Sequence, residues 1–247
     1  MPATSPAAAD PSPRGGPERL PEGLLEGDEK VTAVRAMFDA IAPRYDMVNR
    51  IMTFRMDVGW RKKTVKALDL SLGSVVADLA CGTGDLCEEL RSSGLVPIGV
   101  DLSFGMLANA RTPVPLLQGD ALSLPVRDGS LDGVTCGFAL RNFAALEPFL
   151  ASVARSLRPG GRIAFLEVAT PPNPLLRAGH AVYFGKVVPL IGGLLSDGSA
   201  YRYLPRSVAY LPPPAEVVRM VRDAGFPDAE RRLLSKGISQ LLTGTRG

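Results

Sequence analysis

The sequence has almost no histidine, little cysteine and no long apolar run, and each shortage argues against a class of protein. Only one histidine, His180, and three cysteines occur among its 247 residues, and the cysteines form no CxxC pair. A histidine-rich metal site, a Ser-His-Asp triad and a disulfide framework are therefore not expected, and we predict no metal ligands. An odd number of free thiols is typical of a reduced, cytoplasmic protein.

The most apolar run, "VVPLIGGLL" at residues 187–195, is short. It has about half of the roughly 20 residues that cross a bilayer, so no membrane span is predicted. Such a run can line a slot for an apolar ligand, rest on the membrane surface or be buried in the core, and the sequence leaves these three open. The basic residues are scattered and the net charge is only +3, which argues against nucleic acid as a partner.

The chain divides into an irregular start and a long patterned part. Residues 1–28 hold six prolines together with Ala, Ser and Gly, and they lack the apolar centre of a signal peptide. We therefore expect a disordered N-terminal extension. Residues 29–247 are expected to form one domain, because 46% hydrophobic residues suffice for a full core. Helical spacing, with Asp28 as the expected N-cap, begins this part and stops at Pro43.

From residue 75 onward, short apolar runs alternate with helical patterns. Strands are expected at residues 75–79, 96–101, 114–118, 131–136, 162–169, 229–234 and 238–243. A helix at 145–157 is expected to end at the glycines of "RPGG", and another spans 215–224. The alternation predicts an α/β, Rossmann-like fold, in which helices cover both faces of a mostly parallel seven-stranded sheet and further helices precede it. Residues 171–211 interrupt the alternation, and we expect a lid insertion there.

The stretch "VADLACGTGDL" at residues 76–86 ends a predicted strand with Gly82 and Gly84. A glycine turn between a strand and a helix directs backbone N–H groups at a ligand above the sheet. The fingerprint for NAD needs a third glycine, but Cys87 stands there, and Asp85 would repel a pyrophosphate. A ligand with adenosine but no phosphate is favoured, and S-adenosylmethionine, which carries a sulfonium cation, is such a ligand.

Four acids are expected at the same edge of this sheet, because each follows or ends a predicted strand. They are Asp78, Asp85, Asp101 and Asp120. Asp101 ends the second strand, where a carboxylate can accept both ribose hydroxyls, and Asp120 follows the third, where the adenine should lie. Asp101 alone could simply cap a helix. Together with the turn, the four acids predict a class I S-adenosylmethionine-dependent methyltransferase site.

Four longer stretches resemble the ubiquinone/menaquinone biosynthesis C-methyltransferase family. They are "YDMVNRIMTFRMDVGW" at 45–60, "FALRN" at 138–142, "RSLRPGGRIAFLEVA" at 155–169 and "YRYLPRS" at 201–207. The resemblance implies a single-domain enzyme that uses S-adenosylmethionine to methylate a ring carbon of a polyprenylated quinol, which is demethylmenaquinol in menaquinone pathways. It also implies cofactor contacts at Thr83, Asp101, Asp120 and Ala121.

Some positions depart from the family pattern. Gly137 replaces a serine that contacts the cofactor, Arg55 stands where the family has glycine, and Ser199 with Ala200 replaces an Asp-Ser pair. Two alternatives therefore stay open. One is a methyltransferase for another polyprenyl quinol or small aromatic compound. The other is a catalytically silent cofactor-binding partner in a quinone-pathway complex.

Methylation of a ring carbon needs a base for the quinol hydroxyl proton, or a cation that stabilises the phenolate. The resemblance implies that Arg141 binds or polarises the quinol oxygen, against a surface salt bridge as the plain interpretation. Asn142 orients that oxygen or forms a turn. Asp57 is the leading candidate for the base, because it matches a His/Asp position of the family, although it could equally cap a helix.

Three further residues are expected to bind the substrate. Tyr45 lines the ring pocket or packs in the core, Asp197 belongs to the lid or caps a turn, and Tyr201 shapes the lid. His180 is interpreted as structural or as part of the lid surface. A polyprenyl tail should leave through an apolar slot between the front helices and the insertion. A cytoplasmic location, peripheral contact with the inner face of the cell membrane and a homo-oligomer are all compatible with this sequence.

Overall fold

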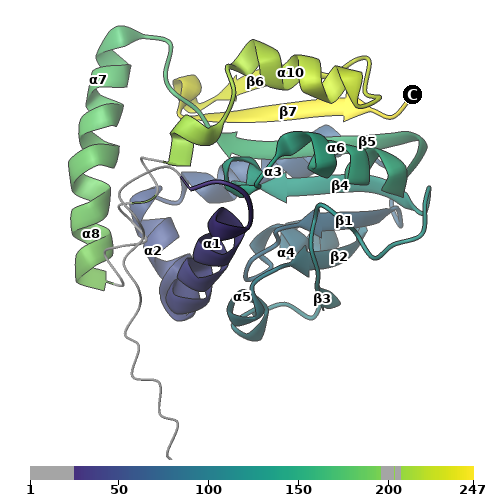
Figure 1. Cartoon of the computed structure of the whole chain (residues 1–247), viewed down its shortest axis with the longest axis horizontal. Helices are drawn as coiled ribbons and strands as arrows, with labels where there is room; N and C mark the ends of the chain where they lie inside the picture. The colour runs from purple at the N-terminus through teal and green to yellow at the C-terminus, as the bar shows by residue number, and fades with distance from the viewer. Residues whose placement is uncertain (1–24, 196–202, 204–206) are drawn as a thin grey trace, which may run out of the picture.

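The structure is a computed structural model, and it describes residues 25–195, 203 and 207–247. Most of the expected N-terminal extension lies outside the described residues, and so do Asp197 and Tyr201 of the insertion. Figure 1 shows a sheet with helices on both faces and a separate group of helices beyond one end of it.

The strands form one sheet in the order β3-β2-β1-β4-β5-β7-β6. Their bounds are β1 Val75–Leu79, β2 Val96–Asp101, β3 Leu116–Gln118, β4 Leu131–Gly137, β5 Leu157–Val168, β6 Glu230–Leu234 and β7 Ser239–Thr245. Neighbours from β3 to β5 run parallel, while β7 is antiparallel to both β5 and β6. The predicted α/β fold with a mostly parallel seven-stranded sheet is confirmed.

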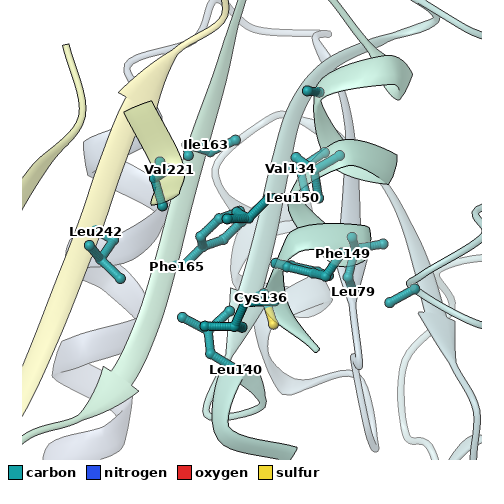
Figure 2. Packing of buried hydrophobic residues seen from close by; sticks show 14 of the residues in the cluster. Leu79, Val134, Cys136, Leu140, Phe149, Leu150, Ile163, Phe165, Val221 and Leu242 are labelled. Carbon is teal, nitrogen blue, oxygen red and sulfur yellow. The ribbon is translucent and has the colours of Figure 1, made fainter. Parts of the chain in front are cut away.

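Apolar side chains on both faces hold helices against the sheet. One face carries α3 Met56–Leu68 and α4 Asp85–Ser92, and the other carries α6 Leu146–Ser156 and α10 Pro214–Asp223. Phe149 of α6 and Phe165 of β5 are completely buried, with ring centroids 5.4 Å apart (Figure 2). Burial of each such ring contributes about 1.5–3 kcal/mol.

The segment between α6 and β5 differs from the prediction. We expected the helix to end on the glycines of "RPGG", but α6 ends at Ser156 and β5 begins at Leu157. The cause is pairing, because Leu157 lies opposite Leu131 and Gly160 N–H donates to the Arg246 carbonyl at 2.8 Å. Gly160 has a φ of 78°, a conformation that favours glycine, so this residue allows the chain to bend inside the strand and does not end the helix.

Beyond the carboxyl ends of the parallel strands lies a group of helices that we call the helical cover (Figure 1). It consists of α1 Gly27–Ile41, η1 Ala42–Arg44, α2 Tyr45–Met52, α7 Pro174–Val182, the π-helical turn η3 Tyr183–Val187 and α8 Val188–Leu195. All of these segments except α7 contribute to a small apolar cluster that includes Ile41, Val48, Met52 and Val188. Asp28, the expected N-cap, lies inside the first turn of α1, and Glu26 occupies the cap position.

Three short segments complete the described chain near the sheet edge. They are α5 Phe104–Ala108, η2 Leu140–Asn142 and η4 Val208–Tyr210, while η5 Ser235–Gly237 joins β6 to β7. Within the described residues, every helix is too short or too polar to cross a lipid bilayer. The run at 187–195 is divided between two environments: Val188 is buried, but Leu190 and Leu194 are exposed.

Candidate active site

The glycine turn after β1 is built from backbone conformations that only a few residues adopt easily. Gly82 and Gly84 have φ values of 57° and 87°, and Ala80 before them has 52°. Gly82 N–H donates to Asp101 Oδ2 at 2.7 Å, and Ser103 N–H donates to Asp101 Oδ1 at 2.8 Å. Burial raises the pKa of Asp101, although these two N–H groups act in the opposite direction. Asp101 therefore ties the turn to the start of α5.

Asp78 lies beneath the turn and is almost completely buried. Thr135 Oγ1 donates to its Oδ1 at 2.8 Å, and the Cys87 thiol donates to its Oδ2 at 3.4 Å. Burial raises the pKa of Asp78 to about 6. Cys87 occupies the position of a third glycine in a dinucleotide site, and here its thiol is a hydrogen-bond partner of the buried acid.

Two arginines change the charge balance of the predicted row of acids. Asp85 forms ion pairs with Arg50 at 3.1 Å and Arg61 at 2.9 Å. Arg61 also pairs with Asp57, whose other oxygen accepts a hydrogen bond from Thr53 Oγ1 at 2.6 Å. The negative charge of Asp85 is therefore largely balanced within the chain, whereas Asp101 is held by backbone N–H groups.

Two acids of the helical cover bind the sheet edge, one at the glycine turn and one at the start of α5, and sequence reasoning missed both. Thr83 Oγ1 donates to Asp46 of α2 at 2.5 Å, and Ser103 Oγ donates to Asp39 of α1 at 2.5 Å. Burial raises the pKa of Asp46. Asp39 offered a signal, because an acid in the last turn of a helix is unfavourable beside the helix dipole unless another group binds it.

Two adjoining hollows lie between the sheet edge and the helical cover. The smaller, of about 120 Å³, is called the narrow pocket, and Asp101, Asp120, Ala121 and Asn142 are among its lining residues. The larger, of about 480 Å³, is called the wide cavity, and Asp57, Asp78, Thr83 and Arg141 are among its lining residues. Tyr45, Gly82, Gly137 and Phe138 line both. The predicted site residues of the described chain therefore line one or both of these adjoining hollows, except Gly84, which lies behind the turn against Thr112.

Arg141 is a fixed and buried cation in the wall of the wide cavity. Its Nη1 forms an ion pair with the fully buried Glu167 and donates to the Phe138 carbonyl at 2.6 Å. Its Nε donates to Ser207 Oγ at 3.0 Å. The ion pair is therefore internal, where the plain interpretation of the sequence placed a salt bridge on the surface. The next residue, Asn142, accepts a hydrogen bond from the Tyr203 hydroxyl at 3.3 Å.

The outer wall of the wide cavity comes from the insertion. The hydroxyl of Tyr183 in η3 donates a hydrogen bond to the Met52 carbonyl of α2 at 2.7 Å, and this bond fastens the insertion to α2. His180 of α7 packs against Phe184, with ring centroids 4.4 Å apart and the planes tilted by 33°, and both line the cavity. Sequence reasoning treated His180 as structural or part of the lid surface, and no local pattern marked it as a lining residue.

Comparison with known proteins places these features in a family. The model of the ubiE/COQ5 methyltransferase family matches residues 26–246. A demethylmenaquinone methyltransferase of Thermus thermophilus is 42% identical over 223 residues, which cover 85% of this chain and 100% of that protein. A ubiquinone/menaquinone biosynthesis C-methyltransferase of Syntrophotalea carbinolica is 39% identical over 222 residues, covering 86% and 93%.

The fold has counterparts among solved structures. A SAM-dependent methyltransferase of Thermotoga maritima superposes with a TM-score of 0.62, covering 86% of this chain and 99% of that chain. The two sequences are only 20% identical, so this likeness concerns the fold. The fold is that of class I methyltransferases.

Proposed function

The chain belongs to the ubiE/COQ5 methyltransferase family, and from this premise we propose that it methylates a ring carbon of demethylmenaquinol. It is an S-adenosylmethionine-dependent methyltransferase of quinone biosynthesis. The observation that carries the choice of substrate is the wide cavity, which adjoins the glycine turn and is lined mainly by apolar and aromatic side chains. A fused aromatic ring with a hydrocarbon tail suits such walls.

The narrow pocket fits the adenosine part of S-adenosylmethionine. A carboxylate offers about four lone-pair sites, so Asp101 can accept two ribose hydroxyls beside its two backbone N–H groups. We assign the adenine to Asp120 and Ala121, and the amino-acid tail to Gly82, Thr83 and Gly84 at the N-terminus of α4. Asp78 supports the turn from beneath. When bound, the cofactor supplies an electrophilic methyl group on a sulfonium.

Arg141 is assigned to the quinol oxygen. Its attachment to Glu167 fixes the guanidinium before substrate arrives, so a developing phenolate meets a cation that needs no reorganisation. Asn142, the next residue, lines the narrow pocket and accepts a hydrogen bond from Tyr203, so Arg141 alone is assigned to this oxygen. Tyr45 packs against the ring, and burial raises the pKa of its hydroxyl. Asp57 remains a candidate base, but both of its oxygens are engaged, so taking a proton would disrupt the ion pair with Arg61.

We further propose that the exposed apolar side chains of the insertion rest on the surface of a membrane, where a polyprenylated quinol resides. Leu175, Leu190 and Leu194 are 82%, 66% and 77% exposed, and Leu175 also lines the wide cavity. Phe54, in the turn between α2 and α3, is 72% exposed and lines the same cavity. A path from lipid to the cavity would let the tail stay in an apolar environment.

The experiment that tests the function is an anaerobic assay with labelled S-adenosylmethionine and reduced demethylmenaquinol, read by mass spectrometry. The expected product carries one labelled methyl group on the ring. Asp101→Asn should weaken cofactor binding about 10- to 100-fold by calorimetry, because one charged acceptor for the ribose is lost. Methylation of simple phenols but not of the quinol would favour a different aromatic substrate. Cofactor binding without turnover on any quinol would favour a silent partner.

A further inference from the structure

Methyl transfer to the quinol requires a group that accepts the hydroxyl proton, and the candidates can be sorted by their present partners. Among the described residues of the wide cavity, Asp57 and Asp85 are held in ion pairs. Asp46 accepts from Thr83, and Asp78 accepts from Thr135 and Cys87. Each of these acids would have to give up an existing interaction in order to act as a base.

The tyrosines of the cavity are no better placed. Tyr183 and Tyr203 donate their hydroxyl hydrogens to Met52 and Asn142, and burial raises the pKa of both. Arg141 and Arg61 are donors only. Burial raises the pKa of Tyr45 as well. The structure therefore supplies a cation for the phenolate, but the acids around it already hold other partners and the phenols have raised pKa values.

His180 differs from all of these. Its Nε2 is buried and has no hydrogen-bond partner within the described chain. The ring lines the wide cavity and packs on one side against the ring of Phe184. A buried polar nitrogen without a partner is uncommon in folded proteins and calls for an explanation, such as a ligand that completes it.

The surroundings keep this imidazole neutral. Burial lowers its pKa below the ordinary value of 6.5. A neutral imidazole with its proton on Nδ1 presents a lone pair on Nε2. Such a nitrogen can accept a proton from a phenolic hydroxyl at neutral pH.

We propose that His180 Nε2 accepts the hydroxyl proton of the quinol in the wide cavity, an assignment that rests on the proposed function. The O–H bond breaks, its proton passes to Nε2, and its electron pair enters the ring. The ring carbon then bonds to the methyl group, while the C–S bond breaks and leaves its electron pair on sulfur. The ring carbon loses its own proton to water, which restores the aromatic ring, and His180 returns its proton to the oxygen. One proton is released in total.

The test compares wild type with His180→Gln, which keeps a polar side chain of similar reach but cannot take a proton. We expect kcat to fall about 100-fold or more, with cofactor affinity unchanged. In wild type, kcat/KM should rise with pH up to a pKa below 6.5, because only neutral His180 is active, and the variant should lack this limb. Val182→Gln is the matched control, because it also introduces glutamine on α7 but at an exposed position, and it should behave as wild type.

A second measurement needs no variant. Because His180 is the only histidine, an untagged, ¹⁵N-labelled chain gives a single imidazole signal by NMR. Saturation with menaquinol, the methylated product, should move this signal and shift its titration. If wild type methylates the quinol but His180→Gln keeps both kcat and the acidic limb, this proposal is overturned and the proposed function stands. If wild type itself fails to methylate the quinol, the proposed function falls, and this proposal with it.

Discussion

The narrow pocket and the wide cavity share a wall but are built in different ways. The narrow pocket lies at the strand ends, where Asp101 is fixed by short hydrogen bonds to Gly82 and Ser103. The wide cavity is closed by the helical cover, which packs through its own apolar cluster and leaves leucines exposed on its far side. The narrow pocket is therefore held in shape by hydrogen bonds between buried polar groups, and the wide cavity by the packing of apolar side chains.

This comparison predicts that polar changes at the sheet edge will affect folding far more than equivalent changes in the cover. Arg141→Ala should give the largest effect. It would leave Glu167 buried without its cation, so the free energy of unfolding should fall by about 3–5 kcal/mol. Urea denaturation followed by circular dichroism measures it.

Arg177→Ala in α7 is the matched control for that change. Arg177 is exposed, and within the part of the chain that the structure describes its side chain donates only to the carbonyls of Pro171 and Pro172. Its loss should lower the free energy of unfolding by about 1 kcal/mol or less. Equal losses for the two variants would contradict the distinction between the two regions.

Asp78→Asn tests what a buried charge does to the stability of the sheet edge. The pKa of Asp78 is about 6 in the folded chain against 3.8 ordinarily, so the folded state binds more protons between these values. Stability from this group is therefore present below pH 4 and is lost as pH rises through 6. The variant should unfold with a free energy higher than wild type by up to about 3 kcal/mol at pH 7.

The same pair of proteins, followed by chemical denaturation from pH 4 to 8, gives the check. The difference between Asp78→Asn and wild type should shrink steadily as the pH falls from 6 toward 4. A variant that is less stable than wild type across the whole range would mean that the bonds from Thr135 and Cys87 to the anion outweigh its burial.

The two regions also differ in how far the sequence alone predicted them. The strands and the glycine turn were predictable because their signals are local: apolar runs of strand length, and glycines where the backbone needs positive φ. The "RPGG" segment was mispredicted because strand pairing with Leu131 and a bond to Arg246 overrode a local helix-stop pattern.

Contacts across the cavities could not be predicted in this way. Asp46 meets Thr83 across 37 positions of the chain, and Arg141 meets Glu167 across 26. No spacing rule links such pairs. The π-helical turn η3 could not be predicted either, because it is a single wide turn within a helical pattern. His180, just before that turn, was therefore assigned to no site.

Two glycines, one in each region, should respond in opposite ways to replacement by alanine. Gly84 in the turn has a φ of 87°, and a Cβ there would lie 2.6 Å from Thr112 Cγ2. Gly84→Ala should lower the free energy of unfolding by about 2 kcal/mol through backbone strain and this clash.

Gly179 in α7 has open space around an added Cβ. Gly179→Ala should raise stability by up to about 1 kcal/mol, because alanine favours a helix. Thermal denaturation measures both variants, and equal melting temperatures for the two would contradict this prediction.

The smallest effect is expected on the exposed side of the cover, and it concerns binding to lipid. Leu190→Gln and Leu194→Gln remove apolar area that faces away from the core, so folding and cofactor affinity should stay unchanged. Each change should lower the partition onto liposomes about fivefold in flotation assays, which corresponds to about 1 kcal/mol of lost burial. Leu72→Gln is the control, because Leu72 is 81% exposed but precedes β1 at the opposite end of the sheet.

If the α8 variants instead change the sedimentation coefficient and leave flotation intact, this face binds a second copy of the chain. The exposed leucines would then mark a homo-oligomer interface, and the tail of the substrate would have to reach the wide cavity by another side.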